Sequence, residues 1–370
     1  MEDNRQTRKV LIAPDSFKGS ATNIEAALAI ARGWKALRPD DEITLIPLAD
    51  GGEGTLETIA GIVPGSKRIY LDVAFYKECT HSAYWSLLPD GTAIVELAIA
   101  CGITHMPQLD PLFTHTYAFG QLIKSAALHP QVQKIITCLG GSASTDGGVG
   151  ALMALGFRFY REDGSDIPLG GKYLNEIASF DGSESVGMPP GGIACLVDVT
   201  NVLIGDRGAA AIFGPQKGAT RQEVIDLNSG LEKLLEISGG SDFLGAGAAG
   251  GTAFGLRTFL NTNIQSGSQS ISELTGLESA VSSCDYVVTG EGLFDSQSVD
   301  GKVIGNLLAI AQKHEKKVLL CVGNTSFDFA DVGLTGIRLI DIAESIDDAM
   351  TNATIWLEKA GTLLALKITD

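Results

Sequence analysis

Three short segments of the sequence place carboxylates beside glycines, and two of them add a lysine, a combination that suits the binding or transfer of an anion. They span residues 15–20, 50–55 and 289–302, and each follows a short apolar stretch. Carboxylates in such turns can hold Mg²⁺ or accept a proton from a substrate hydroxyl, and a lysine can neutralise an anion. Each segment alone is also compatible with an ordinary turn that caps a helix. The candidate catalytic residues are Asp15, Lys18, Asp50, Glu53, Glu291 and Lys302, with Asp295 as a candidate metal ligand.

A fourth segment, residues 140–148, consists almost entirely of small residues (GGSASTDGG). Small side chains let the backbone approach a ligand closely, and the amides at a helix N-terminus bind phosphate, so the segment predicts a phosphate cradle. The alternative is a tight turn whose small residues serve packing. It is not a Walker loop, because no Gly-Lys-Ser/Thr ends it. The candidate cofactor-binding residues are Gly140, Gly141, Ser142, Ser144, Thr145, Asp146 and Gly147.

Two further segments carry weaker signals. Asp198 ends an apolar stretch and offers a metal ligand, and Arg207 and Lys217 follow as cations that could equally be ordinary surface charges. Residues 245–251 match the pattern G-x-G-x-x-G of nicotinamide-binding turns. No convincing strand precedes them, and they open no clear βαβ unit with an acid about 20 residues on. Close helix packing or a ligand contact is therefore the favoured interpretation.

The secondary structure that carries these residues is expected to alternate between strands and helices at both ends of the chain. Strands are expected at 9–13, 42–48, 285–289, 317–322 and 336–342, and helices after the capping box of Thr22 and Glu25 and at 303–314 and 346–364. This alternation predicts an α/β protein with a doubly wound, parallel-sheet domain built from both chain ends, 1–70 and 285–370. Residues 71–284 then form an inserted second α/β domain. The ligand cleft is expected between the two domains, at the carboxyl ends of the strands.

Composition narrows the class of protein further. The chain has 370 residues, 45% of them hydrophobic, which excludes disorder as the main state. A formal net charge of −17 argues against nucleic acid and anionic membranes as partners. The six cysteines and five histidines are scattered without metal-ligand spacing, so we assign them to structure. With neither a signal peptide nor a membrane span expected, we predict a cytoplasmic protein, monomeric or homodimeric.

Taken together and in order, these segments resemble the glycerate kinases of the bacterial type-1 family. The resemblance implies ATP-dependent phosphoryl transfer to D-glycerate with Mg²⁺, in a two-domain α/β protein whose first domain is flavodoxin-like and built from both chain ends. It covers the chain from about residue 9 to its end. The matching segments are APDSFKGS (13–20), ADGGEGT (49–55), VELAIACGI (95–103), LGGSASTDGGVGALMALG (139–156), DVTN (198–201), GAAAIFGPQKGA (208–219), GAGAAGG (245–251) and TGEGLFDSQSVDGKV (289–303).

The resemblance also suggests how the roles divide. The backbone of residues 140–148 would bind the ATP phosphates, and Asp198 and Asp295 would hold Mg²⁺ through waters. Asp50 or Asp15 would take the hydroxyl proton. The cations expected at the glycerate carboxylate and the γ-phosphate are Lys18, Arg207 and Lys302.

The chain departs from the family pattern at three places. Leu293 stands where relatives usually carry an arginine, Val202 where a proline is usual, and residues 117–121 (YAFGQ) have less glycine than is usual and no glutamate. The resemblance favours 2-phosphoglycerate as the product, with 3-phosphoglycerate as the alternative. Two other classes remain open from the residues alone, a nicotinamide-dependent oxidoreductase of a small hydroxy acid and a non-catalytic receptor for small anions.

Overall fold

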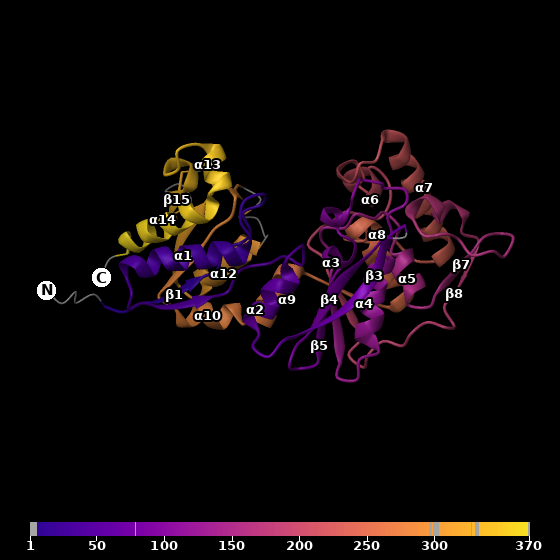
Figure 1. Ribbon diagram of the computed structural model, residues 1–370, viewed down its shortest axis with the longest axis horizontal. Coiled ribbons are helices and arrows are strands. Elements are labelled where there is room, and N and C mark those ends of the chain that lie inside the picture. Colours follow the sequence, from indigo (N-terminus) through magenta and orange to yellow (C-terminus); the bar gives the residue numbers. More distant parts are fainter. Residues whose placement is uncertain are drawn as a thin grey trace. The chain divides into compact units, whose positions relative to one another are not determined.

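The protein is described by a computed structural model that covers residues 6–77, 79–295, 298, 303–326, 328–329 and 333–368 (Figure 1). Its chain forms two compact units. Unit 1 comprises residues 1–50 and 268–370, and unit 2 comprises residues 51–267. Both contain parallel strands joined through helices, so the predicted α/β class is confirmed.

Unit 1 is built on a five-stranded sheet in which every neighbouring pair is parallel. The order across the sheet is β15-β13-β11-β1-β2. Numbered along the chain within this unit, that order is 2-1-3-4-5, which is the order of flavodoxin-like folds. The strands are β1 (Lys9–Ile12), β2 (Glu42–Leu45), β11 (Tyr286–Thr289), β13 (Lys317–Val322) and β15 (Thr335–Arg338).

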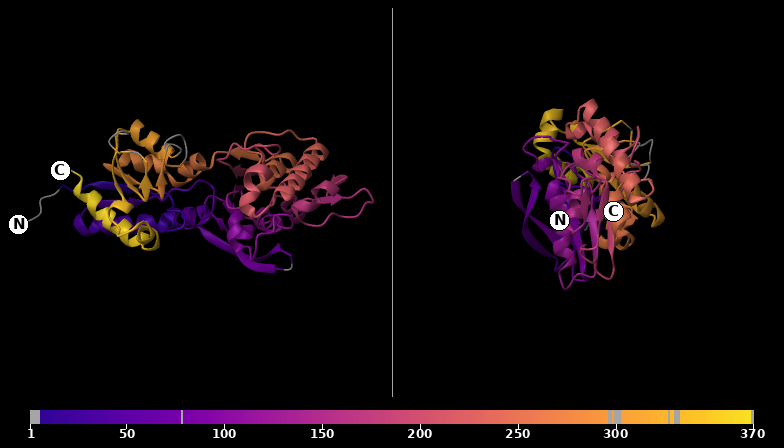
Figure 2. Two further views of the ribbon diagram at one scale, coloured as in Figure 1. Left: turned by 90° about the horizontal axis from the view of Figure 1, so that it is seen from above. Right: turned by 90° about the vertical axis from the view of Figure 1, so that its right-hand side faces the viewer.

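Helices from the two chain ends pack together in unit 1. Helix α1 (Asn23–Leu37) begins with the predicted capping box and runs beside α14 (Ala353–Leu366), as Figures 1 and 2 both show. The two backbones approach so closely that a Cβ at Gly33 would lie 1.7 Å from the carbonyl oxygen of Glu358. The other helices of the unit are α9 (Gly267–Thr275), α10 (Leu277–Ser283), α12 (Val303–Lys313) and α13 (Ile346–Thr351).

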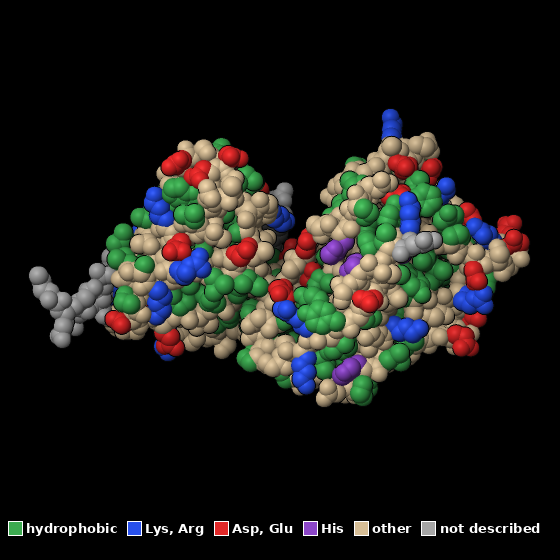
Figure 3. All heavy atoms as spheres, in the orientation of Figure 1, with side chains coloured by type: hydrophobic (Ala, Val, Ile, Leu, Met, Phe, Trp, Pro, Cys, Tyr) green, Lys and Arg blue, Asp and Glu red, His purple; other side chains and the backbone are tan. Residues whose placement is uncertain are grey.

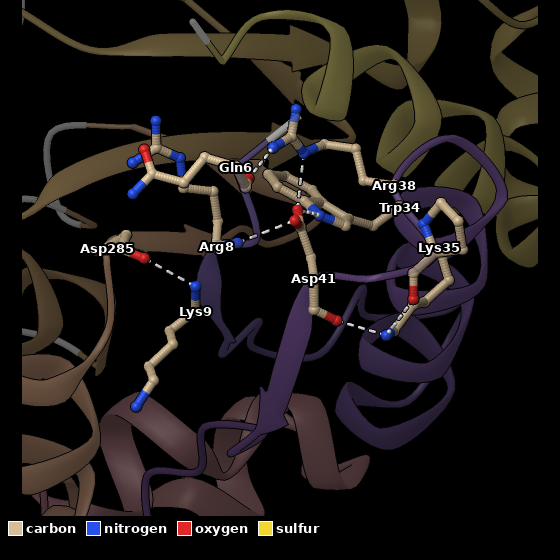
Figure 4. A network of polar contacts seen from close by, with 9 residues as sticks. Gln6, Arg8, Lys9, Trp34, Lys35, Arg38, Asp41 and Asp285 are labelled. Carbon is tan, nitrogen blue, oxygen red and sulfur yellow. Dashed lines mark hydrogen bonds and ion pairs between the residues drawn. The ribbon is translucent and has the colours of Figure 1, made fainter. Parts of the chain in front are cut away.

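A buried polar network joins α1 to the starts of β1 and β2 (Figure 4). The carboxylate of Asp41 accepts hydrogen bonds from Arg38 Nε and from the indole Nε1 of Trp34, both at 2.8 Å, and from the backbone N–H of Arg8 at 3.0 Å. The side chains of Arg38 and Asp41 are only 4% and 2% exposed. An ion pair this deeply buried holds its elements in one geometry only if its hydrogen bonds are complete.

Unit 2 contains a six-stranded mixed sheet in the order β10-β9-β6-β5-β4-β3. The first four strands of that order are parallel, whereas β4 pairs antiparallel with both β5 and β3. The strands are β3 (Lys67–Tyr76), β4 (Cys79–Leu87), β5 (Thr92–Glu96), β6 (Lys134–Cys138), β9 (Ile193–Leu196) and β10 (Asn263–Gln265).

The helices of unit 2 enclose two buried apolar clusters. One lies against the six-stranded sheet and includes Trp85 and Phe119, and the other surrounds Phe159 and Leu231 beside the small β7 (Arg158–Tyr160) and β8 (Ser179–Asp181) pair. The helices are α2 (Thr55–Ile62), α3 (Leu97–Cys101), α4 (Tyr117–Ala127), α5 (Val149–Ala154), α6 (Ala209–Phe213), α7 (Arg221–Ser238) and α8 (Ala248–Leu260).

Three predicted elements differ from the structure. The strand expected at 42–48 ends at Leu45. The strand expected at 336–342 ends at Arg338 and continues as a turn of 3₁₀-helix, Leu339–Asp341. The long helix expected at 346–364 is two helices, because Asn352 leaves helical geometry with φ −108° and ψ 31°. Within the described residues, no helix is both long and apolar enough to cross a membrane.

The limits of the two units also differ from the predicted limits at 70/71 and 284/285. Helix α2 belongs to unit 2, since the amides of Gly54 and Leu56 donate to the carboxylate of Glu96 on β5. Helices α9 and α10 lie in residues that were expected to belong to the insertion, and apart from Gly267 they belong to unit 1. Contacts between segments that are distant in the sequence set the limits of the two units. A local sequence pattern does not show such contacts.

Candidate functional site

The carboxyl edge of the unit 1 sheet brings two predicted segments together. Asp15 follows β1 and donates its backbone N–H to the carbonyl oxygen of Gly290, just after β11, at 2.8 Å. Strands β1 and β11 are neighbours where the strand order reverses, which is where open α/β sheets bind ligands. The backbone is tight here, since a Cβ at Gly290 would lie 1.6 Å from the carbonyl oxygen of Cys321.

The pKa of the Asp15 carboxyl is shifted at this edge of the sheet. Burial raises its pKa from 3.8 to about 6; the charge of Asp50 raises the pKa further, whereas the backbone N–H of Ser16 and the charge of Lys18 lower it. The side chains of Lys18 and Asp50 are exposed. The structure therefore places Lys18 and Asp50 each within electrostatic reach of Asp15, a carboxyl whose pKa of about 6 lies near neutral pH.

The third predicted segment continues this edge. Glu291 is half-buried, and its carbonyl oxygen accepts a hydrogen bond from the backbone N–H of Gly323 at 2.9 Å. Asp295 is half-buried and accepts from the backbone N–H of Ser298 at 3.3 Å. Leu293 lies on the short strand β12 (Leu293–Phe294) with 58% of its surface exposed. The predicted residue Lys302 lies outside the described residues.

In unit 2, the predicted segments again follow the carboxyl ends of parallel strands. The 140–148 loop follows β6, and its Gly140 donates a backbone hydrogen bond to the carbonyl oxygen of Gly51 at 3.2 Å. The exposed carboxylate of Glu53 lies next to the loop, because a Cβ at Gly141 would be 3.8 Å from Glu53 Oε2. This contact between the 51–55 turn and the 140–148 loop was not predicted from the sequence.

The side chains of the 140–148 loop turn into the protein. Asp146 is 1% exposed, and its carboxylate accepts from the backbone N–H and the hydroxyl of Thr116, both at 2.8 Å, and from the N–H groups of Gly150 and Gly148. Ser144 and Thr145 are fully buried, and Gly147 is buried as well. The surface of the loop is its backbone at Gly140 and Gly141 and the edge of Ser142.

Lys217 supports the loop from beneath, a role that sequence reasoning missed. Its side chain is 3% exposed, and its Nζ donates to Ser142 Oγ at 2.9 Å and to the carbonyl oxygen of Ser144. Burial lowers its pKa from 10.5 to about 8, against the opposing attraction of Asp146. The only local signal is its position in the glycine-flanked segment GPQKG. Arg207, by contrast, is exposed.

The glycines of residues 245–251 pack against the same loop. A Cβ at Gly250 would lie 2.1 Å from the carbonyl oxygen of Ser144, and Gly147 donates its N–H to the carbonyl oxygen of Gly250 at 3.0 Å. The preceding regular element is the helix α7, so this G-x-G-x-x-G pattern does not follow a strand as a nicotinamide-binding turn must. Its small residues serve close packing.

Few of the acidic side chains that the structure describes in either unit lie close enough together to ligate a metal ion. Among the described residues, no group of three or more His, Cys, Asp or Glu side chains could hold an ion. Asp198 follows β9 and is exposed, and its Oδ1 accepts hydrogen bonds from Gly267 N at 2.8 Å and Ser266 Oγ at 3.0 Å. On the face drawn in Figure 3, Lys and Arg side chains are interspersed with Asp and Glu and do not gather into one basic patch.

Comparison with known proteins identifies the class. The chain is 37% identical to the glycerate 2-kinase of Escherichia coli K12 over 345 residues (90% of this chain, 89% of the relative) and 37% identical to a glycerate kinase of Bacillus subtilis 168 over 379 aligned positions (97% of each). A crystal structure from Salmonella typhimurium LT2, assigned as glycerate kinase 2, superposes with a TM-score of 0.82 at 33% identity and covers 98% of both chains. The protein is therefore a kinase with an α/β fold.

Residues 10–369 match the glycerate kinase family, and the chain belongs to that family. The resemblance seen in the sequence motifs is thus confirmed along nearly the whole chain.

Proposed function

We propose that the protein transfers the γ-phosphoryl group of ATP to D-glycerate, giving 2-phosphoglycerate and ADP with the help of Mg²⁺. The observation that carries the proposal is Asp15, a carboxyl of pKa about 6 at the strand-order reversal of unit 1, with Lys18 and Asp50 in electrostatic reach. This is a group able to accept a hydroxyl proton beside a cation able to hold an anion. The name of the Escherichia coli relative, glycerate 2-kinase, favours the 2-position.

The roles we propose follow from exposure and charge. In unit 1, Asp15 or Asp50 accepts or orients the substrate hydroxyl, Lys18 binds an anionic group, and Glu291 shapes the edge beside them. Lys302 is proposed as a second cation on the strength of the sequence alone. In unit 2, the catalytic candidates Glu53 and Arg207 have exposed side chains that are available to a ligand.

We infer that the 140–148 loop binds ATP phosphates through its backbone, because the surface it offers is the backbone of Gly140 and Gly141 and the edge of Ser142. The buried Ser144, Thr145, Asp146 and Gly147 then fix the loop's shape.

Two of the predicted site residues carry the oxygen ligands that Mg²⁺ prefers. Asp198 and Asp295 offer carboxylate oxygens, and Mg²⁺ retains several waters, so it does not need a cage of three or more protein ligands. We propose these two residues as its protein contacts, made through waters. When bound, Mg²⁺ would neutralise charge on the phosphates.

The test is ADP release that depends on both D-glycerate and Mg²⁺, followed by ³¹P and ¹³C NMR of the product. We expect a phosphate ester on C2. An ester on C3 would show that the product is 3-phosphoglycerate, and the proposed kinase reaction would still hold. No glycerate-dependent ADP release, or NADH formation from a hydroxy acid without ATP, would overturn the proposal.

A further inference from the structure

Glu96 is a buried carboxylate to which neither the sequence analysis nor the proposed mechanism assigns a role. It is the last residue of β5, is 1% exposed, and reaches back to residues about forty positions earlier in the chain. Its Oε1 accepts the backbone N–H of Gly54 at 3.0 Å, and its Oε2 accepts that of Leu56 at 2.8 Å. Both carboxylate oxygens are therefore acceptors from one short stretch of backbone.

These two bonds supply the cap that α2 cannot provide for itself. The helix begins at Thr55, and its N-cap residue is Gly54, which has no side chain to satisfy the first N–H groups. Glu96 is itself the residue before α3 but makes no side-chain cap there, since its carboxylate is engaged with α2. A negative charge at a helix N-terminus is favourable, so the ionised form suits this position.

The backbone held in this way is the turn that carries Glu53. Residues 51–55 include Gly51 and Gly54, whose backbone φ angles are +85° and +86°. Residues other than glycine rarely adopt this conformation. On its outer side the turn exposes Glu53 and contacts Gly140 of the small-residue loop. On its inner side it rests on Glu96.

The groups around Glu96 set its ionisation. Burial raises its pKa from 4.5 to about 7; the two N–H bonds lower the pKa, and the charges of Glu53 and Glu57 raise it. On the neighbouring strands, Tyr84 donates its hydroxyl to Glu57 at 2.8 Å and Arg68 pairs with Glu57 at 2.7 Å. A protonated carboxyl would direct an O–H at one of the two backbone donors and lose that bond.

We propose that Glu96 is a positioning residue for the 51–55 turn: its ionised carboxylate holds the turn in place, and protonation releases it, so that turnover falls as the solution becomes acidic. The inference rests on the proposed function only where it concerns turnover. The ordering of the turn is a property of the chain itself and can be measured without substrate.

The first experiment measures the turn directly. In the wild-type protein, the ¹⁵N-detected shifts of the Gly54 and Leu56 amides should titrate with a midpoint near pH 7. In Glu96→Gln, the amide group can accept only one of the two bonds, so hydrogen exchange at Gly54 or Leu56 should accelerate by about tenfold or more. Amide shifts that do not move between pH 5 and 9 would overturn the proposal, and this measurement needs no variant.

The matched control is Glu57→Gln. Glu57 is a half-exposed carboxylate on α2, the helix that Glu96 caps, and its side chain makes no hydrogen bond to the 51–55 turn. The substitution should leave exchange at Gly54 and Leu56 unchanged. It should also move the wild-type midpoint to lower pH, because a neighbouring negative charge is removed. Equal acceleration in both variants would mean that the cap does not hold the turn.

The second experiment connects the turn to turnover. The kcat of the wild type should rise with pH through about 7, and Glu96→Gln should lose about tenfold in kcat above pH 7 and show no rise there. A normal kcat and an unchanged pH profile in Glu96→Gln would overturn the role in catalysis. A wild type without glycerate kinase activity would instead refute the proposed function, and the amide measurements would still decide the role of Glu96.

Discussion

The backbone N–H of Gly140 donates a hydrogen bond to the carbonyl oxygen of Gly51 at 3.2 Å, which joins the small-residue loop to the turn that carries Glu53. This contact requires a glycine at position 140, because a Cβ at Gly140 would lie 2.4 Å from Gly52 Cα. Two loops that are far apart in the chain thus share one backbone interface within unit 2.

Replacing Gly140 by alanine should separate these loops. We expect a loss of about 1 to 3 kcal/mol in the free energy of unfolding, from overpacking, and a raised KM for ATP. Urea unfolding and steady-state kinetics measure both. The control is Gly61→Ala in α2, where a Cβ meets nothing within 4 Å; alanine there should stabilise the protein by about 0.5 to 1 kcal/mol. A silent Gly140→Ala variant would refute the close contact.

Lys217→Met should loosen the loop from beneath. Removing the ammonium leaves Ser142 Oγ and the carbonyl oxygen of Ser144 without their buried donor, which should cost about 1 to 3 kcal/mol of unfolding free energy at pH 7. In the wild type, the unfolded chain binds this proton more tightly than the folded one between pH 8 and 10.5, so Lys217 makes stability rise with pH across that window. The variant should lack this rise. Lys233→Met, at a more exposed ion pair on α7, should keep it.

Asp15→Asn should abolish an ionisation near pH 6 in the profile of kcat/KM and lower kcat on the order of 10²- to 10⁴-fold if Asp15 takes the hydroxyl proton. Asp50→Asn should move the ionisation of Asp15 to lower pH, because the charge of Asp50 raises that pKa. Asp40→Asn, an exposed carboxylate of the same unit, is the control and should leave the profile unchanged. Near-normal turnover in Asp15→Asn would remove it from catalysis.

Asp15 should also affect stability in a definite direction. Its folded pKa of about 6 exceeds the ordinary value of 3.8, so the folded protein retains a proton that the unfolded chain has lost, and stability falls as pH rises from about 4 through 6. At pH 7, Asp15→Asn should therefore be more stable than the wild type by on the order of 1 to 3 kcal/mol. Urea unfolding at pH 5 and 7 measures the difference, and a less stable variant at pH 7 would contradict the burial argument.

The buried pair of Arg38 and Asp41 and the exposed pair of Arg338 and Asp341 form a natural comparison. Both are i, i+3 pairs with Nε–Oδ2 distances of 2.8 and 2.7 Å. Asp41→Ala removes the carboxylate that pairs with the buried guanidinium of Arg38 and accepts from the Trp34 indole, so the free energy of unfolding should fall by about 3 to 5 kcal/mol. Asp341→Ala should cost no more than about 1 kcal/mol. Equal losses would show that burial does not set the value of these pairs.

Elements that depend on interactions between neighbouring residues could be predicted from the amino-acid sequence alone. The capping box of Thr22 and Glu25 marks the start of α1, and the alternation of apolar runs and glycine turns gives the α/β class. It also placed Asp15, Lys18 and Glu291 after strands, and the rules for parallel sheets then put them at one edge. These signals act over a few residues and are readable along the chain.

Which charged groups are buried, and which segments they hold in place, followed from the folded chain and not from the sequence pattern. Lys217, which reads as a surface cation, braces a loop 75 residues earlier, and Glu96 caps a helix 42 residues earlier. Burial and pKa depend on the chain segments that surround a side chain, and those segments come from distant parts of the sequence. The same reason explains the limits of the two units, because long-range packing, unlike propensity, leaves no local pattern.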